Sequence, residues 1–113
     1  MLSKVNRLKG KQKFDVVFKK GEKFYSPYFV MYTYSPSIAS EKPANTQIGI
    51  VASKKVGGAV IRNRSRRMIS ELLRMNLSNL KPQTHYVFVL FKTMATVTRE
   101  QLSEALQKLK LIK

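Results

Sequence analysis

The stretch SKKVGGAVIRNRSRRMISELLR, residues 53–74, holds the clearest structural signal in this chain of 113 residues. Near its start, Gly57 and Gly58 break the extended segment that precedes them and predict a turn. From Ala59 to about Met75, apolar side chains recur at the spacing of a helix. They form one broad stripe, made of Ile61, Met68, Ile69, Leu72 and Leu73. The stretch therefore predicts a helix that packs one side against a core.

Extended segments are predicted on both sides of this helix. Gln47 to Ser53 is rich in Ile and Val and predicts a strand, and Tyr86 to Phe91 predicts a nearly all-apolar strand inside the sheet. Farther upstream, successive side chains from Tyr28 to Tyr34 point alternately to two faces, which predicts a strand that can pack on both of them. One face carries Tyr28, Val30, Tyr32 and Tyr34, and the other carries Phe29, Met31 and Thr33. The pattern leaves room for a short extra strand, in the polar loop of residues 35–46 or around Lys23 to Ser26.

A helix is predicted near each end of the chain. The first runs from Lys9 to Lys20, with apolar residues at helical spacing and a glycine, Gly21, as its stop. The last begins at Thr98, which forms a capping-box pattern with Gln101. Val97 and Leu102 are spaced for the hydrophobic staple that accompanies such a start, and the apolar face is completed by Ala105, Leu106, Leu109 and Ile112.

The predicted order is helix, strand, strand, helix, strand, helix, within a single domain of residues 1–113. This order is typical of the α+β class. We expect a two-layer α/β sandwich, in which about four strands form a mixed sheet and three helices pack on it. Hydrophobic residues make up 43% of the chain, enough for one modest core.

The charge of the chain points to a polyanionic partner. Lys and Arg number 22 and Asp and Glu number 6, which gives a formal net charge of +16. Such an excess opposes compaction, and a nucleic acid explains it more simply than an anionic membrane does. There is no cysteine, so disulfides, Cys-containing zinc sites and thiol nucleophiles are excluded. The basic start lacks the apolar core of a signal peptide, and the longest apolar run is far too short to span a bilayer, so we expect a soluble protein of the cytoplasm.

The predicted central helix concentrates the positive charge. Between Glu41 and Glu71 there is no acidic residue, while the chain from Ser53 to Arg67 holds six cations: Lys54, Lys55, Arg62, Arg64, Arg66 and Arg67. Helical spacing places Asn63, Arg66, Arg67 and Arg74 opposite the apolar stripe. Like charges four residues apart, and cations in the first turn of a helix, both disfavour helix formation. Arginine also grips phosphate through two hydrogen bonds. A solvated basic face remains the simpler reading, but the missing acids favour an RNA-binding surface.

These residues carry a family resemblance. Lys54-Lys55-Val56-Gly57, Ala59-Val60, Arg62-Asn63-Arg64 and Arg66-Arg67 together resemble the arginine-asparagine-arginine signature of the bacterial ribonuclease P protein component. The resemblance extends to Asn6-Arg7-Leu8 with Phe14, Phe18 and Gly21, and to Phe29-Val30-Met31-Tyr32, so it covers about Asn6 to Leu109. Ser65 departs from it, because the family often has an aliphatic residue there.

The resemblance implies a left-handed βαβ crossover and two RNA-binding surfaces. One would contact the catalytic RNA subunit through Lys54, Lys55, Arg62, Asn63, Arg64, Arg66 and Arg67. The other would be a cleft between the first helix and the sheet, lined by Phe14, Phe18 and Tyr32, that receives the 5′ leader of precursor tRNA. Aromatic side chains beside positive charge suit a single strand without fixed sequence. From spacing alone, however, Phe14 and Phe18 also fit a core, and Tyr28 and Tyr34 could either extend the cleft or pack.

The resemblance also implies a ribonucleoprotein enzyme whose RNA performs the cleavage. The partners would be the ribonuclease P catalytic RNA and precursor tRNA, with no membrane and no required protein partner. The RNA subunit would need Mg²⁺, and the protein would bind no cofactor itself. The reaction would be endonucleolytic hydrolysis that releases the leader and the mature 5′ end of tRNA.

Catalysis by the polypeptide alone is not expected. His85 is the only histidine, so a mechanism with two histidines is excluded. The six carboxylates are scattered, which argues against a metal site, and Gly57-Gly58 lacks the remainder of a phosphate-binding loop. We therefore expect no catalytic and no metal-ligating residues in this chain.

Three other functions remain as alternatives. A ribosomal-protein-like module or general RNA chaperone has the same composition, and only the arginine motif with its flanking segments argues against it. A stand-alone basic nuclease lacks a suitable set of residues. A membrane-surface protein would use the last helix, which is amphipathic and carries Lys108, Lys110 and Lys113, but its capped start favours core packing.

Overall fold

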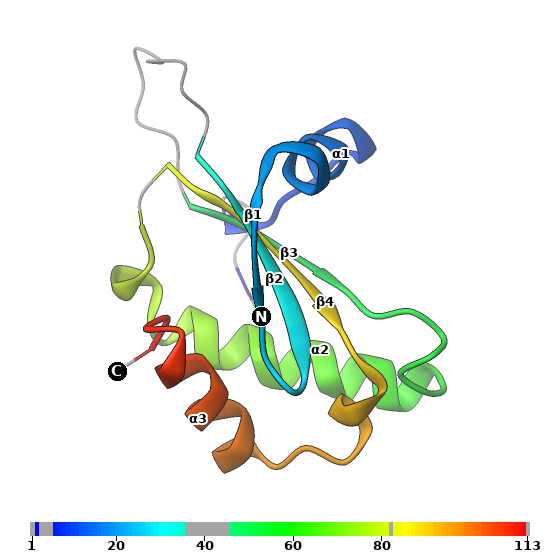
Figure 1. Ribbon diagram of the computed structural model, residues 1–113. Helices are drawn as coiled ribbons and strands as arrows, with labels where there is room; N and C mark the ends of the chain where they lie inside the picture. Colours follow the sequence, from blue (N-terminus) through cyan, green and yellow to red (C-terminus); the bar gives the residue numbers. More distant parts are fainter. Residues whose placement is uncertain (1, 3–5, 36–45, 82, 113) are drawn as a thin grey trace.

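The computed structural model describes residues 2, 6–35, 46–81 and 83–112 (Figure 1). Two short 3₁₀ helices, η2 (Leu77–Asn79) and η3 (Lys92–Ala95), join longer elements. The longer elements are α1 (Lys11–Lys20), β1 (Glu22–Tyr25), β2 (Phe29–Tyr34), β3 (Gln47–Val51), α2 (Ala59–Arg74), β4 (His85–Leu90) and α3 (Arg99–Lys108). Each predicted helix and strand is therefore present, and the extra strand lies at β1, one of its two expected places.

The four strands form one mixed sheet in the order β1-β2-β4-β3. β2 runs antiparallel to both β1 and β4, whereas β3 runs parallel to β4. Parallel neighbours need a crossover connection, and α2 is the helix of that connection. The α+β sandwich with a mixed four-stranded sheet is thus confirmed, while the hand of its crossover stays a prediction.

The two faces of the sheet are covered unequally. α2 and α3 pack against one face, and α1 lies against one end of the other (Figure 1). The main core lies on the first face, where Phe29 and Phe88 meet with ring centroids 5.2 Å apart. A smaller cluster under α1 is centred on Leu8, Val17 and Val87. Among the described residues no helix is long and apolar enough to cross a membrane.

The faces of β2 follow the predicted alternation except at Tyr28. Phe29 and Met31 belong to the main core, while Tyr32 and Tyr34 pack at the edge of the smaller cluster. Tyr28 was expected to share the face of Tyr32, but it precedes β2 and packs against the main core instead. A bend at Ser26, whose hydroxyl accepts hydrogen bonds from the backbone N–H groups of Tyr28 and Phe29, takes this residue out of the alternation.

α2 buries most of its predicted stripe but not its first turn. Ile69, Leu72 and Leu73 are buried and Met68 is half-buried. Ile61 was expected in the same stripe, yet it is 36% exposed. Its side chain lies instead beside Gly57, close to where a Cβ at that position would be. The buried stripe therefore begins after the first turn of α2, and the first turn packs on its own loop.

The start of α3 matches the predicted capping box. The Thr98 side chain accepts a hydrogen bond from the Gln101 backbone N–H at 3.1 Å, and the Gln101 side chain accepts one from the Thr98 N–H at 3.0 Å. Val97 and Leu102 are both buried in the main core, as a hydrophobic staple requires. This end of α3 is fixed by local chemistry that the sequence already contained.

Gly49 sets how closely α1 approaches the sheet. A Cβ at this position would lie 2.5 Å from two ring atoms of Phe14, so the ring rests directly on the β3 backbone. We predict that Gly49→Ala lowers the free energy of unfolding by about 1–3 kcal/mol, because the ring must move and α1 loses packing. Denaturant unfolding measures this. In a Phe14→Ala background the same substitution should cost almost nothing; an equal cost in both backgrounds would contradict the close contact as the cause.

Candidate nucleic-acid interface

The predicted cationic residues gather on the loop before α2 and on the first half of that helix. We call this set the arginine surface: Lys54, Lys55, Arg62, Asn63, Arg64, Arg66 and Arg67. α2 begins after Gly58 without a side-chain cap and without an acidic residue in its first turn. The first backbone N–H groups of a helix and its dipole both attract negative charge. Helix start and side chains together therefore favour an anion on this surface.

Two arginines of this surface are tied to the fold. Arg66 donates from Nη2 to the backbone carbonyl of Ala52 at 3.3 Å and from Nη1 to the Asn63 Oδ1 at 3.1 Å. It is half-buried rather than fully outward as the helical spacing suggested, because it reaches back to the end of β3. Arg64 makes a longer bond, 3.4 Å, from Nη2 to the carbonyl of Val97, just before α3.

The remaining arginines are less engaged. Arg67 is exposed and makes no hydrogen bond or ion pair with any part of the chain that the structure describes. Arg62 is half-buried, and its Nε is shielded from solvent without a partner among the described residues. A buried donor left without an acceptor costs about 1–3 kcal/mol. The surface therefore contains both anchored guanidinium groups and groups that the fold leaves unsatisfied.

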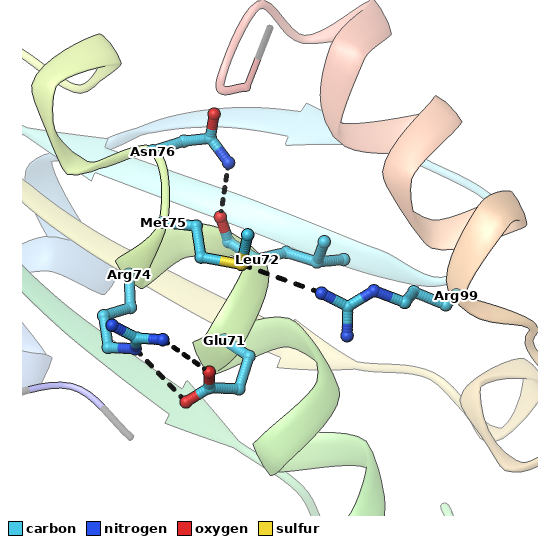
Figure 2. A network of polar contacts seen from close by, with 6 residues as sticks. All are labelled: Glu71, Leu72, Arg74, Met75, Asn76 and Arg99. Carbon is cyan, nitrogen blue, oxygen red and sulfur yellow. Dashed lines mark hydrogen bonds and ion pairs between the residues drawn. The ribbon is translucent and has the colours of Figure 1, made fainter.

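The other end of α2 is arranged differently (Figure 2). Arg74 donates two hydrogen bonds to Glu71, at 2.8 and 3.3 Å. Hydrogen bonding, most of all to this arginine, lowers the pKa of the Glu71 carboxyl to about 2, so the pair stays ionised over the whole neutral range. Arg99 contacts the Met75 sulfur, and Asn76 donates to the carbonyl of Leu72. Charge is compensated here, in contrast to the uncompensated first half of the helix.

The three residues of the expected leader cleft are brought together. Phe18 stacks edge-on against Tyr32 with ring centroids 4.9 Å apart, and the Phe14 and Phe18 centroids are 6.4 Å apart. Phe18 is 36% exposed and the other two rings are half-buried. We call these three rings the aromatic platform. Phe14 and Tyr32 pack against the small cluster under α1, whereas Phe18 is exposed, so the platform is partly core and partly open surface.

The surroundings of the platform add one cation that the sequence did not single out. Lys23 is the cross-strand partner of Tyr32, and its Nζ lies 5.6 Å from the Tyr32 ring centroid. A cation over an aromatic face is a favourable contact. β1 is only four residues long, so alternation along it was too brief to assign its faces before the pairing was known. The same register places Tyr25 on the platform face, where it is 68% exposed.

Tyr34 and His85 form the far edge of this face. Their ring centroids are 6.5 Å apart. Burial, reinforced by the charge of Lys13, lowers the pKa of the His85 imidazole below its ordinary value. His85 is therefore neutral at neutral pH and adds no positive charge to the platform.

A hollow of about 220 Å³ lies between the two candidate surfaces. It is lined by Phe14 from the platform and Arg66 from the arginine surface, with Gly49 and Ile50 of β3 between them. Phe18 and Tyr32 lie outside it. Among the described residues, no group of three His, Cys, Asp or Glu side chains is placed to hold a metal ion. The two surfaces are thus neighbours across the β3 edge, and both present chemistry suited to phosphates and bases.

Comparisons with known proteins agree on one family. A family model described as Ribonuclease P matches residues 2–112. The chain is 46% identical over 85 residues to a ribonuclease P protein component of Nitratiruptor sp., covering 75% of this chain and 71% of that protein. It is 33% identical over 108 residues to one of Bacillus pumilus, covering 96% and 87%.

Solved structures give the same result. The RNase P protein of Staphylococcus aureus superposes with a TM-score of 0.79 at 27% identity, covering 91% of this chain and 90% of that one. The RNase P protein of Thermotoga maritima superposes with a TM-score of 0.78 at 26% identity, covering 95% and 97%.

The different bonding of Arg66 and Arg67 predicts different effects on stability without RNA. Arg66→Ala should lower the free energy of unfolding by about 1 kcal/mol, because the bonds to Ala52 and Asn63 are lost. Arg67→Ala should change it by less than about 0.5 kcal/mol, as for an exposed side chain without partners. Denaturant unfolding of the free protein distinguishes them. Equal values for both variants would contradict the anchoring of Arg66.

Proposed function

Because this chain belongs to the ribonuclease P protein family, we propose that it is the protein subunit of a cytoplasmic ribonuclease P and binds both the catalytic RNA and the 5′ leader of precursor tRNA. The RNA subunit performs the Mg²⁺-dependent hydrolysis that removes the leader. The protein binds and orients the two RNAs. It needs no membrane and no second protein for this role.

The observation that carries the proposal is the uncompensated arginine surface. From Lys54 to Arg67 the chain has six cations and no acid, and α2 starts there without a cap. Folding alone would favour glutamate in such a first turn, since acids there stabilise a helix and cations do not. Bound phosphates make the cations favourable instead, because each phosphate neutralises a guanidinium group or the positive end of the helix dipole. The arginine surface is therefore the proposed contact with the catalytic RNA.

The aromatic platform is the proposed contact with the leader. A leader is single-stranded, so its bases are free to stack, and stacking on aromatic rings tolerates any sequence. Phe18 offers an exposed ring edge-on to Tyr32, and Lys23 places a positive charge beside them. These side chains bind the leader by its general chemistry, as an enzyme with many tRNA precursors requires.

The metal belongs to the RNA in this proposal. The carboxylates of the described residues do not converge on a common point, which is a poor donor set for Mg²⁺. The protein instead lowers the repulsion between the phosphates of the two RNAs, so that they approach at lower Mg²⁺ concentrations. Bound Mg²⁺ on the RNA supplies the activation of the attacking water.

Reconstitution tests the proposal directly. The protein is added to the cognate catalytic RNA at low Mg²⁺, and cleavage of precursor tRNA is measured. We expect strong stimulation by the protein together with the RNA, and no cleavage by the protein alone. Annealing of unrelated RNAs without stimulated cleavage would instead indicate a general RNA chaperone, and cleavage by protein alone would indicate a nuclease.

The exposed guanidinium of Arg67 gives a sharper prediction for the catalytic RNA. Arg67→Ala should weaken binding and reduce the slope of log affinity against log salt by about 1, which corresponds to one lost phosphate contact. Arg74→Ala removes the same formal charge at the compensated end of α2 and is the matched control. Its slope should stay at the wild-type value. Equal slopes for all three proteins would show that Arg67 is solvated in the complex.

Phe18 gives the corresponding prediction for the leader. In the reconstituted complex, Phe18→Ala should weaken the binding of leader-bearing tRNA by about tenfold and leave mature tRNA almost unchanged, because one stacking ring is lost. Competition binding with the two tRNAs measures the difference. Phe18→Leu keeps an apolar side chain for packing but has no aromatic face, so it should behave like the alanine variant. Equal losses for both tRNAs would indicate a structural role.

A further inference from the structure

One row of side chains crosses the whole sheet beside the aromatic platform. The pairing register aligns Tyr25 of β1 with Val30 of β2, Val30 with Val89 of β4, and Val89 with Val51 of β3. The neighbouring row contains Lys23, Tyr32, Val87 and Gly49 on the same face. Residues two apart in a strand are about 7 Å apart. The row that ends in Tyr25 therefore lies about 7 Å from the row of Tyr32, measured along the strands.

This row is less covered than the platform row, although Val30, the partner of Tyr25 within it, is buried. Val17 and Phe14 of α1 lie over Val87 and Gly49, in the row of Tyr32. In the next row, Val51 and Val89 are only half-buried, although they pack at the edge of the small cluster. The result is an apolar floor in front of α1, bounded on one side by the platform rings.

Tyr25 stands at the β1 end of this floor and has no evident role in folding. It lies on an edge strand and is 68% exposed, so it buries little surface. Its neighbour Phe24 points to the other face, where it lines a hollow with Met31 and Leu109. An exposed tyrosine ring therefore lies beside an apolar floor and on the same face as two other half-open aromatic rings.

The charges around the floor select the class of ligand. Lys23 precedes Tyr25 by two residues on the same face, and its Nζ lies over the Tyr32 ring. At the other end of the row, Val51 is followed within four residues by the exposed Lys54 and Lys55. Glu22, the acid of β1, is two residues from Phe24 and shares the opposite face. Rings between cations, with no acid on this face of β1, suit a single-stranded RNA.

We propose that Tyr25 is an additional base-stacking residue, which extends the aromatic platform onto β1 and holds a leader nucleotide beyond those bound by Phe18 and Tyr32. The proposal rests on leader binding by the platform. It makes β1 part of the leader-binding surface, and it gives longer leaders a contact that shorter leaders cannot reach. Tyr25 acts as a positioning residue for the substrate, remote from the bond that is cleaved.

The test uses the reconstituted complex and a series of precursor tRNAs whose leaders lengthen by one nucleotide at a time. Wild-type affinity should rise at one length as the leader meets Phe18 and Tyr32, and rise again when it reaches Tyr25. Tyr25→Thr keeps the strand propensity but has no ring, so it should remove the second rise, about tenfold in dissociation constant, and keep the first. Tyr25→Phe keeps the ring and should restore the second rise.

Phe24→Ala is the matched control, since it weakens the same strand but alters only the opposite face. It should retain both rises, and thermal unfolding of all variants checks that each one folds. If Tyr25→Thr retains the second rise while Phe18→Ala loses the first, the role of Tyr25 is wrong and leader binding stands. If Phe18→Ala also retains both rises, the proposed leader site itself is wrong. If Tyr25→Thr and Phe24→Ala lose the same affinity at every leader length, Tyr25 only stabilises the pairing of β1 with β2, and the proposal is overturned.

Discussion

The parallel pairing of β3 with β4 is the constraint on which the rest of this structure depends. Two adjacent parallel strands cannot be joined by a tight turn, so the chain has to cross the sheet between them. α2 makes that crossing and buries one side of itself against the main core. Its start lies just beyond the end of β3, which brings the loop of Lys54 and Lys55 to the edge where Arg66 meets Ala52. The same connection that builds the core therefore presents the arginine surface.

The two halves of α2 divide stability and recognition between them. Its C-terminal half carries the buried Ile69, Leu72 and Leu73 and a compensated Arg74. Its N-terminal half carries an uncapped start, cations with no acid in the first turn, and the Arg62 Nε, which has no partner within the described part of the chain. Each of these features costs stability in the free protein, by amounts of up to about 1–3 kcal/mol. One helix can carry this cost because its other half supplies the packing.

The sequence predicted most of this fold because its strongest signals are local. The capping box at Thr98, the stripe of α2 and the alternation of β2 each depend on residues within a few positions of one another. Errors arose where the chain turns: Tyr28 leaves the alternation at the Ser26 bend, and Ile61 packs on its own loop. The arginines were identified from sequence, but which of them are anchored was not, because the partner of Arg66 lies 14 residues away. Phe14 and Phe18 could not be assigned to core or surface, because that depends on how α1 packs on the sheet. Tyr25 was missed because only the pairing of β1 with β2 places it on the platform face.

The bond between Arg66 and Ala52 also lies beside the exposed edge of the sheet. β3 is an edge strand, and its sequence, QIGIV, is apolar enough to pair with the same strand of another molecule. One hydrogen-bonding position of this strand is already occupied, because the Leu8 N–H donates to the carbonyl of Ile48, and Arg66 donates to the carbonyl of Ala52, the first residue after the strand. A residue of the arginine surface thus also occupies a backbone acceptor beside the exposed sheet edge, where an additional strand would otherwise find a free carbonyl.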